Sequence, residues 1–231
     1  MNKSGRTSSR IIPRTYDGIG DKTIHQWMVR FAMAIQDYEA ELTELDQAIG
    51  DGDHGINMHR GMSAAVARLN ELVSAEPYAQ LRSVSMTLTS TIGGSSGPLY
   101  GAFFLQSSHV IHHRSNLTLA EMTLVIDAGY RGVVQLGKAE VGDKTMVDTL
   151  DAAVKSLRAS TANSETIPTA LERCRQAARQ AARNTIPMIA KRGRASYLGE
   201  RSAGTQDPGA TSACLLFDAL AQAFQGLSEV P

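Results

Sequence analysis

Apolar residues between positions 24 and 45 recur every three or four residues, which is the spacing of one face of an α-helix. They form one long stripe: Ile24, Trp27, Met28, Phe31, Ile35, Tyr38, Leu42 and Leu45. A helix with such a stripe has to bury it against other elements. The stripe therefore requires a fold in which further helices or a sheet cover a long helical face.

The rest of the chain supplies helices. Apolar residues at helical spacing occupy 62–72 and 81–88, and further helices are predicted over 98–113, 118–136, 145–160, 168–192 and 208–227. No stretch combines sustained alternation with the β-branched enrichment of strands. We predict an all-α fold of eight helices in a single domain over residues 22–231. The basic, polar residues 1–21 are expected to form a flexible arm, or a docked tail that contacts a partner.

Charge and hydropathy argue against two classes of partner. Lys plus Arg and Asp plus Glu number 23 each, so the chain lacks the bulk positive charge that binds nucleic acid or acidic membranes. No apolar run approaches the roughly 20 residues of a membrane span. Cys174 and Cys214 fall on apolar helical faces, which indicates buried, reduced thiols. We expect a cytoplasmic protein with no nucleic-acid or membrane partner.

Glycine concentrates in four connections between the predicted helices. They read GDGDHG, TIGGSSGPLYG, LGKAEVGDKT and RGRASYLGERSAGTQDPG. Alternate loops of an up-and-down bundle lie at the same end, so we expect these four to meet there. Asp207 followed by Pro208 is typical of a helix start, and Ser95 or Ser96 can cap another helix. Free N–H groups at such helix starts bind phosphate.

Three aspartates lie within eight residues in ELDQAIGDGDHGINMHRG, at Asp46, Asp51 and Asp53. Helix caps and turns are one interpretation, because Asp and Gly are common in both. A calcium-binding EF-hand is excluded, since counting from Asp51 puts Ile56 where Gly is required and Met62 where Glu is required. Three hard oxygen donors without cysteine favour Mg²⁺, which normally keeps positions open for substrate phosphates.

Four motifs together resemble the nucleotide-binding L domain (DhaL) of dihydroxyacetone kinases. In chain order they are ELDQAIGDGDHGINMHRG, GGSSGPLYG, GKAEVGDKTMVD and KRGRASYLGERSAGTQDPGATS. The resemblance spans about residues 22–225, and one inserted or substituted basic residue within 191–193 departs from the family pattern. It implies a closed barrel of eight antiparallel, up-and-down helices with the nucleotide site at one end, in agreement with the helix count.

The resemblance also implies the ligands of the site. The metal-binding residues would be Asp46, Asp51 and Asp53, which would coordinate two Mg²⁺ ions that bridge the nucleotide phosphates. The residues that would bind the cofactor ADP or ATP are His54, Gly55, Ile56, Asn57, Ser95, Ser96, Gly137, Met146, Arg194, Asp207, Pro208 and Gly209. Arg194 and His54 are the expected catalytic residues.

Physical roles can be given to several members of this set. Ser95 and Ser96 would offer hydroxyl and N–H donors at a helix start. Met146 has a polarizable apolar surface that suits an adenine face. Arg194 is a permanent cation that can offset phosphate charge. For His54, a structural loop histidine with satisfied hydrogen bonds is the alternative.

The chemistry that these residues support is phosphoryl transfer, in which positioning and charge neutralisation dominate. GGSSGPLYG lacks the Gly-Lys-Ser/Thr ending of a Walker A motif. By resemblance, a separate K subunit holds the ketone, and an M subunit of the phosphotransferase system recharges ADP that stays bound to L. An ATP-dependent two-subunit kinase for a related sugar such as erythrulose is the alternative, as is a regulatory protein that binds a transcription regulator. A homodimer is also expected.

Overall fold

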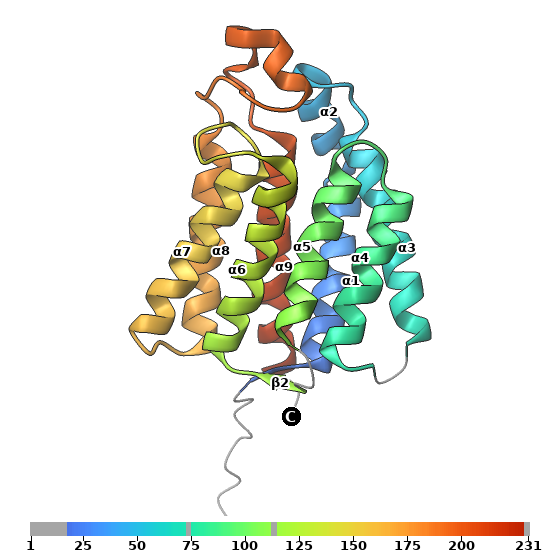
Figure 1. Ribbon diagram of the computed structural model, residues 1–231, viewed down its shortest axis with the longest axis vertical. Coiled ribbons are helices and arrows are strands. Elements are labelled where there is room, and N and C mark those ends of the chain that lie inside the picture. The colour runs from blue at the N-terminus through green and yellow to red at the C-terminus, as the bar shows by residue number, and fades with distance from the viewer. Residues whose placement is uncertain (1–17, 73–74, 112–114, 229–231) are drawn as a thin grey trace, which may run out of the picture.

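The computed structural model of this protein is almost entirely helical (Figure 1). It describes residues 18–72, 75–111 and 115–228. The helices of this part are α1 (Asp21–Asp37), α2 (Glu39–Ile49), α3 (His54–Glu71), α4 (Pro77–Thr91), α5 (Ser96–Val110), α6 (Leu119–Gly137), α7 (Met146–Ala162), α8 (Ile167–Asn184), the 3₁₀-helix η1 (Arg194–Ser202) and α9 (Pro208–Ser228). The all-α class is confirmed, but the described residues form more than the eight helices predicted.

The first additional helix arises because the long apolar stripe is broken at Tyr38. This residue has φ −100° and ψ 8°, which ends α1, and its side chain is exposed although the stripe included it. The chain resumes as α2, which packs against α3 and α9. Leu42 and Asp46 thereby face inward. A single straight helix would instead have carried this segment away from the bundle.

The second additional helix is η1. It forms after α8, which ends at Asn184 and not at residue 192 as predicted. Pro187 explains the early end, because proline disfavours the helical conformation of the residue before it and has no N–H for the helix ladder. The chain then leaves the bundle and forms η1 above it (Figure 1). This excursion, residues 185–207, places Arg194 over the end of the bundle.

A minimal sheet lies at the opposite end of the molecule. Strand β1 (Ile19–Gly20) pairs antiparallel with β2 (Asn116–Leu117), in register Ile19 to Leu117. Ile19 and Leu117 are both fully buried. Residues 18–21 of the predicted arm are therefore packed into the fold. Residues 1–17 of that arm lie outside the described residues.

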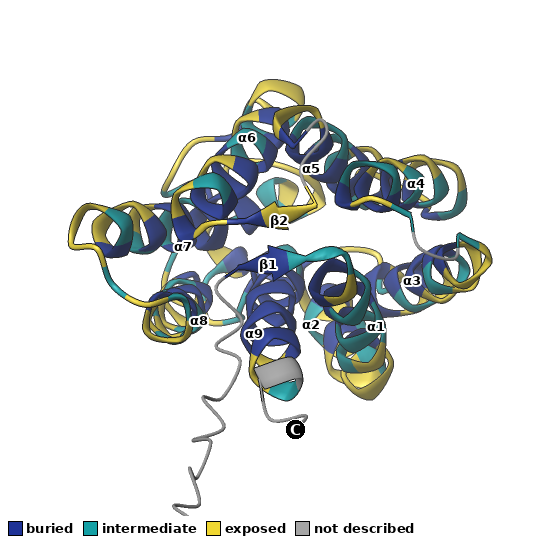
Figure 2. Ribbon diagram, turned by 90° about the horizontal axis from the view of Figure 1, so that it is seen from below, coloured by how far each residue is buried: buried dark blue, intermediate teal, exposed yellow. Residues whose placement is uncertain are grey.

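The long helices surround an apolar core, seen end-on in Figure 2. Each of α3 to α8 contacts its neighbours along the chain, and α9 contacts both α8 and α1. Trp27 on α1 is fully buried and donates its indole N–H to the carbonyl of Leu216 on α9 at 2.8 Å. Cys174 and Cys214 are buried free thiols, as predicted. Among the described residues, no helix is long and apolar enough to cross a membrane.

Candidate functional site

The four glycine-rich connections meet at one end of the bundle, as the up-and-down arrangement predicted. They line a cavity of about 350 Å³. Four helices start at its wall, at His54 for α3, Ser96 for α5, Met146 for α7 and Pro208 for α9. Since the N–H groups of a helix start point away from the helix, this end of the molecule presents several backbone donors and positive dipole ends to one cavity.

The aspartate cluster forms one wall of the cavity. One carboxylate oxygen from each of Asp46, Asp51 and Asp53 can be chosen so that the three lie within 4.8 Å of one another. Asp46 comes from the last turn of α2, and the other two from the loop before α3. Three carboxylates this close repel one another unless a cation neutralises them. Hard oxygen donors in this number fit Mg²⁺.

Two glycines allow the cluster to form. A Cβ at Gly50 would lie 2.1 Å from the Asp46 Oδ1 atom, so no larger residue fits beside this carboxylate. A Cβ at Gly55 would lie 2.1 Å from the Glu39 carbonyl oxygen, at the point where α3 crosses the start of α2. Gly50 and Gly55 are therefore required by close contacts on either side of Asp51 and Asp53.

Backbone donors orient the innermost carboxylate of the cluster. The Oδ2 atom of Asp46 accepts hydrogen bonds from the N–H groups of Asp53 at 2.9 Å and His54 at 3.1 Å. Burial raises the pKa of Asp46, and the charges of Asp51 and Asp53 add to this effect. The two N–H donors oppose it without cancelling it. A bound dication would reverse this balance, because its charge favours ionised carboxylates.

Arg194 lies across from this cluster, on the excursion that carries η1. Its Nη1 atom is 2.9 Å from Asp51 Oδ2, and two thirds of the arginine side chain is exposed. A pair with this exposure contributes little to stability. The guanidinium is therefore held near the aspartates but remains free to move to another anion in the cavity.

His54 is buried beside the same cavity, and both nitrogens of its ring have hydroxyl groups as hydrogen-bond partners. Its Nδ1 atom lies 3.1 Å from Ser96 Oγ, and its Nε2 atom lies 2.9 Å from Ser212 Oγ. Burial lowers the pKa of His54 to about 4, so the ring is neutral at pH 7. The imidazole is thus a fixed hydrogen-bonding group and not a mobile cation.

The N-cap residues of α3 and α5 make no side-chain cap hydrogen bond, but at α3 Asp46 accepts from the His54 N–H. The N-cap residue of α5 is Ser95. At α7, by contrast, Thr145 and Asp148 form a capping box, and at α9 the Oδ2 atom of Asp207 accepts from the Ala210 N–H at 2.7 Å. The first N–H groups of α5 therefore remain available to an anion.

Known proteins of one family match most of this chain. The family described as "DAK2 domain" matches residues 48–222 of the chain. The chain belongs to the DAK2 domain family. An Escherichia coli protein named "PEP-dependent dihydroxyacetone kinase, ADP-binding subunit DhaL" is 44% identical over 200 residues, which cover 87% of this chain and 95% of that protein. A Lactococcus lactis protein named "PTS-dependent dihydroxyacetone kinase, ADP-binding subunit DhaL" is 38% identical with the same coverage.

Longer proteins also contain a similar segment. An "L-erythrulose 1-kinase" of Mycolicibacterium smegmatis is 35% identical over 198 residues, which cover 83% of this chain and 34% of that protein. The crystal structure of the dihydroxyacetone kinase of C. freundii superposes with a TM-score of 0.68 at 24% identity, over 96% of this chain and 38% of that one. The DAK2 domain fold is thus found both as a separate subunit and as part of a larger kinase.

Most of the residues predicted to bind nucleotide in this DAK2 domain line the cavity. They are His54, Ser95, Ser96, Gly137, Met146, Arg194, Asp207, Pro208 and Gly209, together with the three aspartates. Gly55, Ile56 and Asn57 do not belong to the lining. Gly55 packs against α2, Ile56 is half exposed, and Asn57 Oδ1 accepts a hydrogen bond from Arg60. The side chains of Ile56 and Asn57 are therefore not part of the cavity wall, although the start of α3 is.

Asp207 combines deep burial with a place in the cavity wall. Burial raises the pKa of its carboxyl group to about 7, although the Ala210 N–H and the nearby Lys144 charge act in the opposite direction. Its backbone N–H donates to the hydroxyl of Thr185 at 3.0 Å. Asp207 is therefore held between the first turn of α9 and Thr185 at the end of α8.

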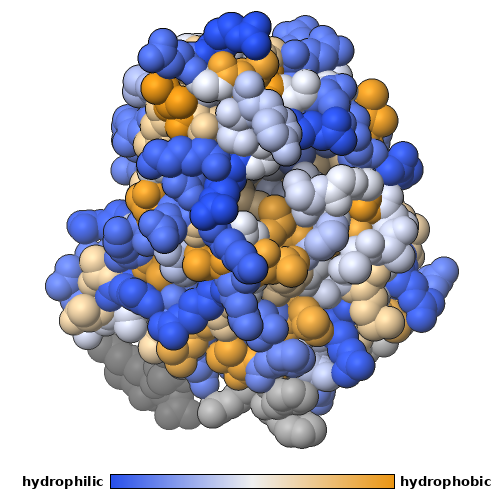
Figure 3. Space-filling model, turned by 45° about the horizontal axis from the view of Figure 1, so that its top comes forward, coloured by the Kyte–Doolittle hydropathy of each residue, from blue (hydrophilic) through white to orange (hydrophobic). Residues whose placement is uncertain are grey.

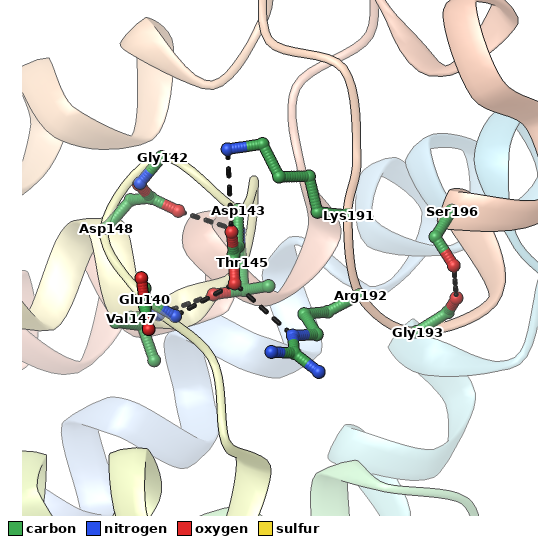
Figure 4. A network of polar contacts seen from close by, with 10 residues as sticks. All are labelled: Glu140, Gly142, Asp143, Thr145, Val147, Asp148, Lys191, Arg192, Gly193 and Ser196. Carbon is green, nitrogen blue, oxygen red and sulfur yellow. Dashed lines mark hydrogen bonds and ion pairs between the residues drawn. The ribbon is translucent and has the colours of Figure 1, made fainter.

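A polar network around Asp143 holds the excursion in place (Figure 4). The Oδ2 atom of Asp143 accepts from the Glu140 N–H at 2.9 Å and from Arg192 Nε at 3.3 Å, and its backbone carbonyl accepts from the Lys191 N–H at 3.1 Å. Although burial opposes ionisation, the Glu140 N–H, Arg192 and Lys191 together lower the pKa of Asp143. Arg192, which lines the cavity, is a further cation that the motif comparison did not single out.

Lys144 is a buried cation that the sequence analysis missed. Its side chain is 1% exposed, and its Nζ atom donates to the carbonyls of Thr185 and Thr205, each at 2.6 Å. These carbonyls lie at the two ends of the excursion, just after α8 and just before α9. Lys144 lies within the motif GKAEVGDKTMVD, and this position was the one feature of the sequence that could have marked it as a residue of the site. The ammonium group thereby connects both ends of the excursion to the loop before α7.

We expect Lys144→Met to lower the free energy of unfolding by about 3 kcal/mol, because two buried carbonyls lose a charged hydrogen-bond donor. Urea denaturation followed by circular dichroism measures the change. Lys22→Met, at an exposed position of α1, is the matched control and should change the free energy by less than about 0.5 kcal/mol. Equal stability of the two variants would contradict the role assigned to Lys144.

On the face shown in Figure 3, exposed apolar side chains lie scattered among hydrophilic ones. The loop before α7 contributes Val141, and η1 contributes Tyr197, which is 88% exposed. Leu136 at the end of α6 and Ile189 on the excursion are also about half exposed. These residues lie on the segments that carry the cavity wall.

Proposed function

We propose that this chain is the ADP-binding subunit of a phosphoenolpyruvate-dependent dihydroxyacetone kinase. In this proposal the phosphoryl group passes from an M subunit of the phosphotransferase system, via ADP bound to this chain, to dihydroxyacetone held on a K subunit. The observation that carries the proposal is a cluster of three carboxylates that shares one cavity with four helix starts. A metal–phosphate ligand matches both sides of this cavity.

The proposed cofactors are ADP or ATP and two Mg²⁺ ions. Asp46, Asp51 and Asp53 would hold the metal, because they are clustered hard donors whose mutual repulsion a dication relieves. Bound magnesium would neutralise phosphate charge during transfer. The N–H groups at the start of α5 would hold phosphate oxygens, and Met146 and Gly137 would border the base.

The mechanism that we propose for the protein groups is positioning and charge compensation. Arg194 would exchange its contact with Asp51 for one with the phosphoryl group, which would leave the Asp51 carboxylate available to hold the metal. His54 stays neutral and orients Ser96 beside the phosphate site. The Asp143 network and Lys144 keep the excursion over the cavity, which limits the access of water to the transferring group.

The scaffold in this proposal is a closed bundle of eight antiparallel helices, with the short α2 outside the ring, in one domain over residues 22–231. The contacts from α3 through α9 and back to α1 support it. Partners beyond K and M would be a second copy of this chain in a homodimer, and a transcription regulator. The proposed location is the cytoplasm.

An ATP-dependent kinase for erythrulose or a related sugar is the second candidate. The M. smegmatis L-erythrulose 1-kinase contains a similar segment, which favours this alternative. That protein is about three times longer than the matched segment, whereas the E. coli and L. lactis relatives match this chain over 95% of their own length. The higher identity of the E. coli and L. lactis ADP-binding subunits, 44% and 38% against 35%, favours the subunit that works with K and M.

Retention of nucleotide distinguishes the two candidates. If ADP is a resident cofactor, protein purified without added nucleotide should contain close to one equivalent of ADP, measured by chromatography of the denatured supernatant. A chelator should release this ADP, and the apoprotein should melt at a lower temperature because it loses a bound ligand.

Turnover provides the opposing outcome. Mixed with a K subunit, dihydroxyacetone and ATP but no M subunit, the protein should give at most a slow burst of product. Steady ATP-driven turnover that equals the rate with phosphoenolpyruvate and the phosphotransferase proteins would favour the ATP-dependent kinase. Absence of ADP binding under all conditions would contradict both candidates.

A further inference from the structure

A buried chain of hydrogen bonds links three helices behind the cavity wall. Tyr100 on α5 lies with its hydroxyl 2.8 Å from Ser212 Oγ on α9. Ser212 Oγ lies 2.9 Å from Nε2 of His54 at the start of α3, and Nδ1 of the same ring lies 3.1 Å from Ser96 Oγ. Tyr100 and Ser212 are fully buried, and Ser96 lies at the cavity.

The direction of these bonds follows from counting protons at Ser212. A serine hydroxyl has one proton to donate and two lone pairs that accept. The Ser212 hydroxyl lies 3.1 Å from the Gly209 carbonyl, which can only accept. Only one arrangement makes all three contacts of Ser212 hydrogen bonds. In it, the Ser212 hydroxyl donates to the Gly209 carbonyl and accepts from both Tyr100 and His54.

This arrangement determines the tautomer of His54. Its Nε2 atom has to carry the proton that is donated to Ser212. The ring is buried and each of its nitrogens contacts an uncharged hydroxyl group, so the ring is neutral and Nδ1 is an acceptor. The Ser96 hydroxyl consequently donates its single proton to Nδ1, away from the cavity.

We propose that Ser212 fixes the Nε2–H tautomer of His54 and thereby leaves Ser96 Oγ with only lone pairs to present to the cavity. Ser96 Oγ then accepts from an electropositive group, which is the divalent cation or water bound to it, and does not donate to a phosphate oxygen. This refines the expectation that both Ser95 and Ser96 act as hydroxyl donors. The part that concerns the cation rests on the proposed function, whereas the tautomer does not.

Nitrogen-15 NMR of the ligand-free full-length protein tests the tautomer directly. Two-bond correlations between the ring nitrogens and carbon-bound protons distinguish Nε2–H from Nδ1–H, and a His54→Gln variant identifies the His54 signals. We expect the Nε2–H pattern in the unmodified protein. An Nδ1–H pattern, or a mixture of the two in comparable amounts, would overturn the proposal.

Two variants separate this role from a packing role. Ser212→Ala removes the acceptor for Nε2–H and should shift the ring toward the Nδ1–H form, which can donate to Ser96. Tyr100→Phe is the matched control, since it removes a hydroxyl from the same cluster but leaves the acceptor at Ser212 in place, and it should retain the Nε2–H pattern. The same response in both variants, or in neither, would contradict the proposal.

Calorimetry with ADP tests the consequence at Ser96. Ser96→Ala should weaken ADP binding about tenfold with saturating Mg²⁺, and less than twofold in the presence of a chelator. Ser95→Ala should weaken ADP binding to a similar extent in both conditions if its hydroxyl donates to phosphate. Equal weakening by Ser96→Ala in both conditions would show that Ser96 donates to phosphate. A complete lack of ADP binding would refute the proposed function but leave the NMR result intact.

Discussion

Asp53→Asn should raise the dissociation constant of ADP, measured by calorimetry with Mg²⁺, by more than about 100-fold. Groups that only support a metal ligand typically contribute 10- to 100-fold to metal affinity, so a ligand itself should contribute more. Asp53 is the best residue to change, because Asp51 also contacts Arg194 and Asp46 accepts two backbone hydrogen bonds. Asparagine keeps the size of the side chain and removes one of three adjacent charges.

The same substitution should leave the apoprotein at least as stable as the unmodified protein. Removal of a charge from the cluster relieves repulsion between carboxylates. The melting temperature without ligand, measured by circular dichroism, should therefore hold or rise. Asp37→Asn, at the exposed end of α1, is the control and should preserve ADP affinity. Wild-type affinity in the Asp53→Asn protein would refute the metal assignment.

Arg194→Ala should lower the rate of phosphoryl transfer by about 100- to 1000-fold, which is the usual effect of removing one preorganised donor to a developing charge. The dissociation constant of ADP should rise less than about tenfold, because in the free protein this guanidinium is held by Asp51 and is mostly exposed. The comparison requires single-turnover rates together with calorimetry on the same protein. A larger effect on rate than on affinity marks stabilisation of the transition state.

Two further variants test whether the guanidinium of Arg194 itself is needed: Arg194→Lys and Arg201→Ala. Lysine should restore little of the rate, since it cannot make the paired contacts of a guanidinium. Arg201 is an exposed arginine at the far end of η1, so its removal controls for a change of charge on the excursion. Equal losses in rate and in ADP affinity for Arg194→Ala would make it a ground-state binding residue.

The sequence alone was sufficient for the class of fold and for most of the cavity wall. Helical periodicity is local, because it reflects which side of one helix is buried. It located α4 to α7 and α9 within a few residues, and α3 except for its first eight residues. The glycine-rich loops were assigned to one end by connectivity alone, and the structure brings them together there. The aspartate cluster was visible because all three residues lie within eight positions.

The tertiary structure decided what depends on contacts between distant segments. The break at Tyr38 follows from the packing of α2 on α3 and α9, which no local pattern records. Ile56 was expected at the site by resemblance, and the structure leaves its side chain half exposed and outside the cavity lining.

The partners of the long-range hydrogen bonds could not be predicted from the sequence. Lys144 binds carbonyls 41 and 61 residues away, and Ser212 reaches His54 across 158 residues. Sequence periodicity reports whether a side chain faces the core, whereas the identity of its partner depends on how the helices are placed around that core. For this reason the sequence determined which groups the site contains, and only the packed bundle determined which way they point and which of them donate.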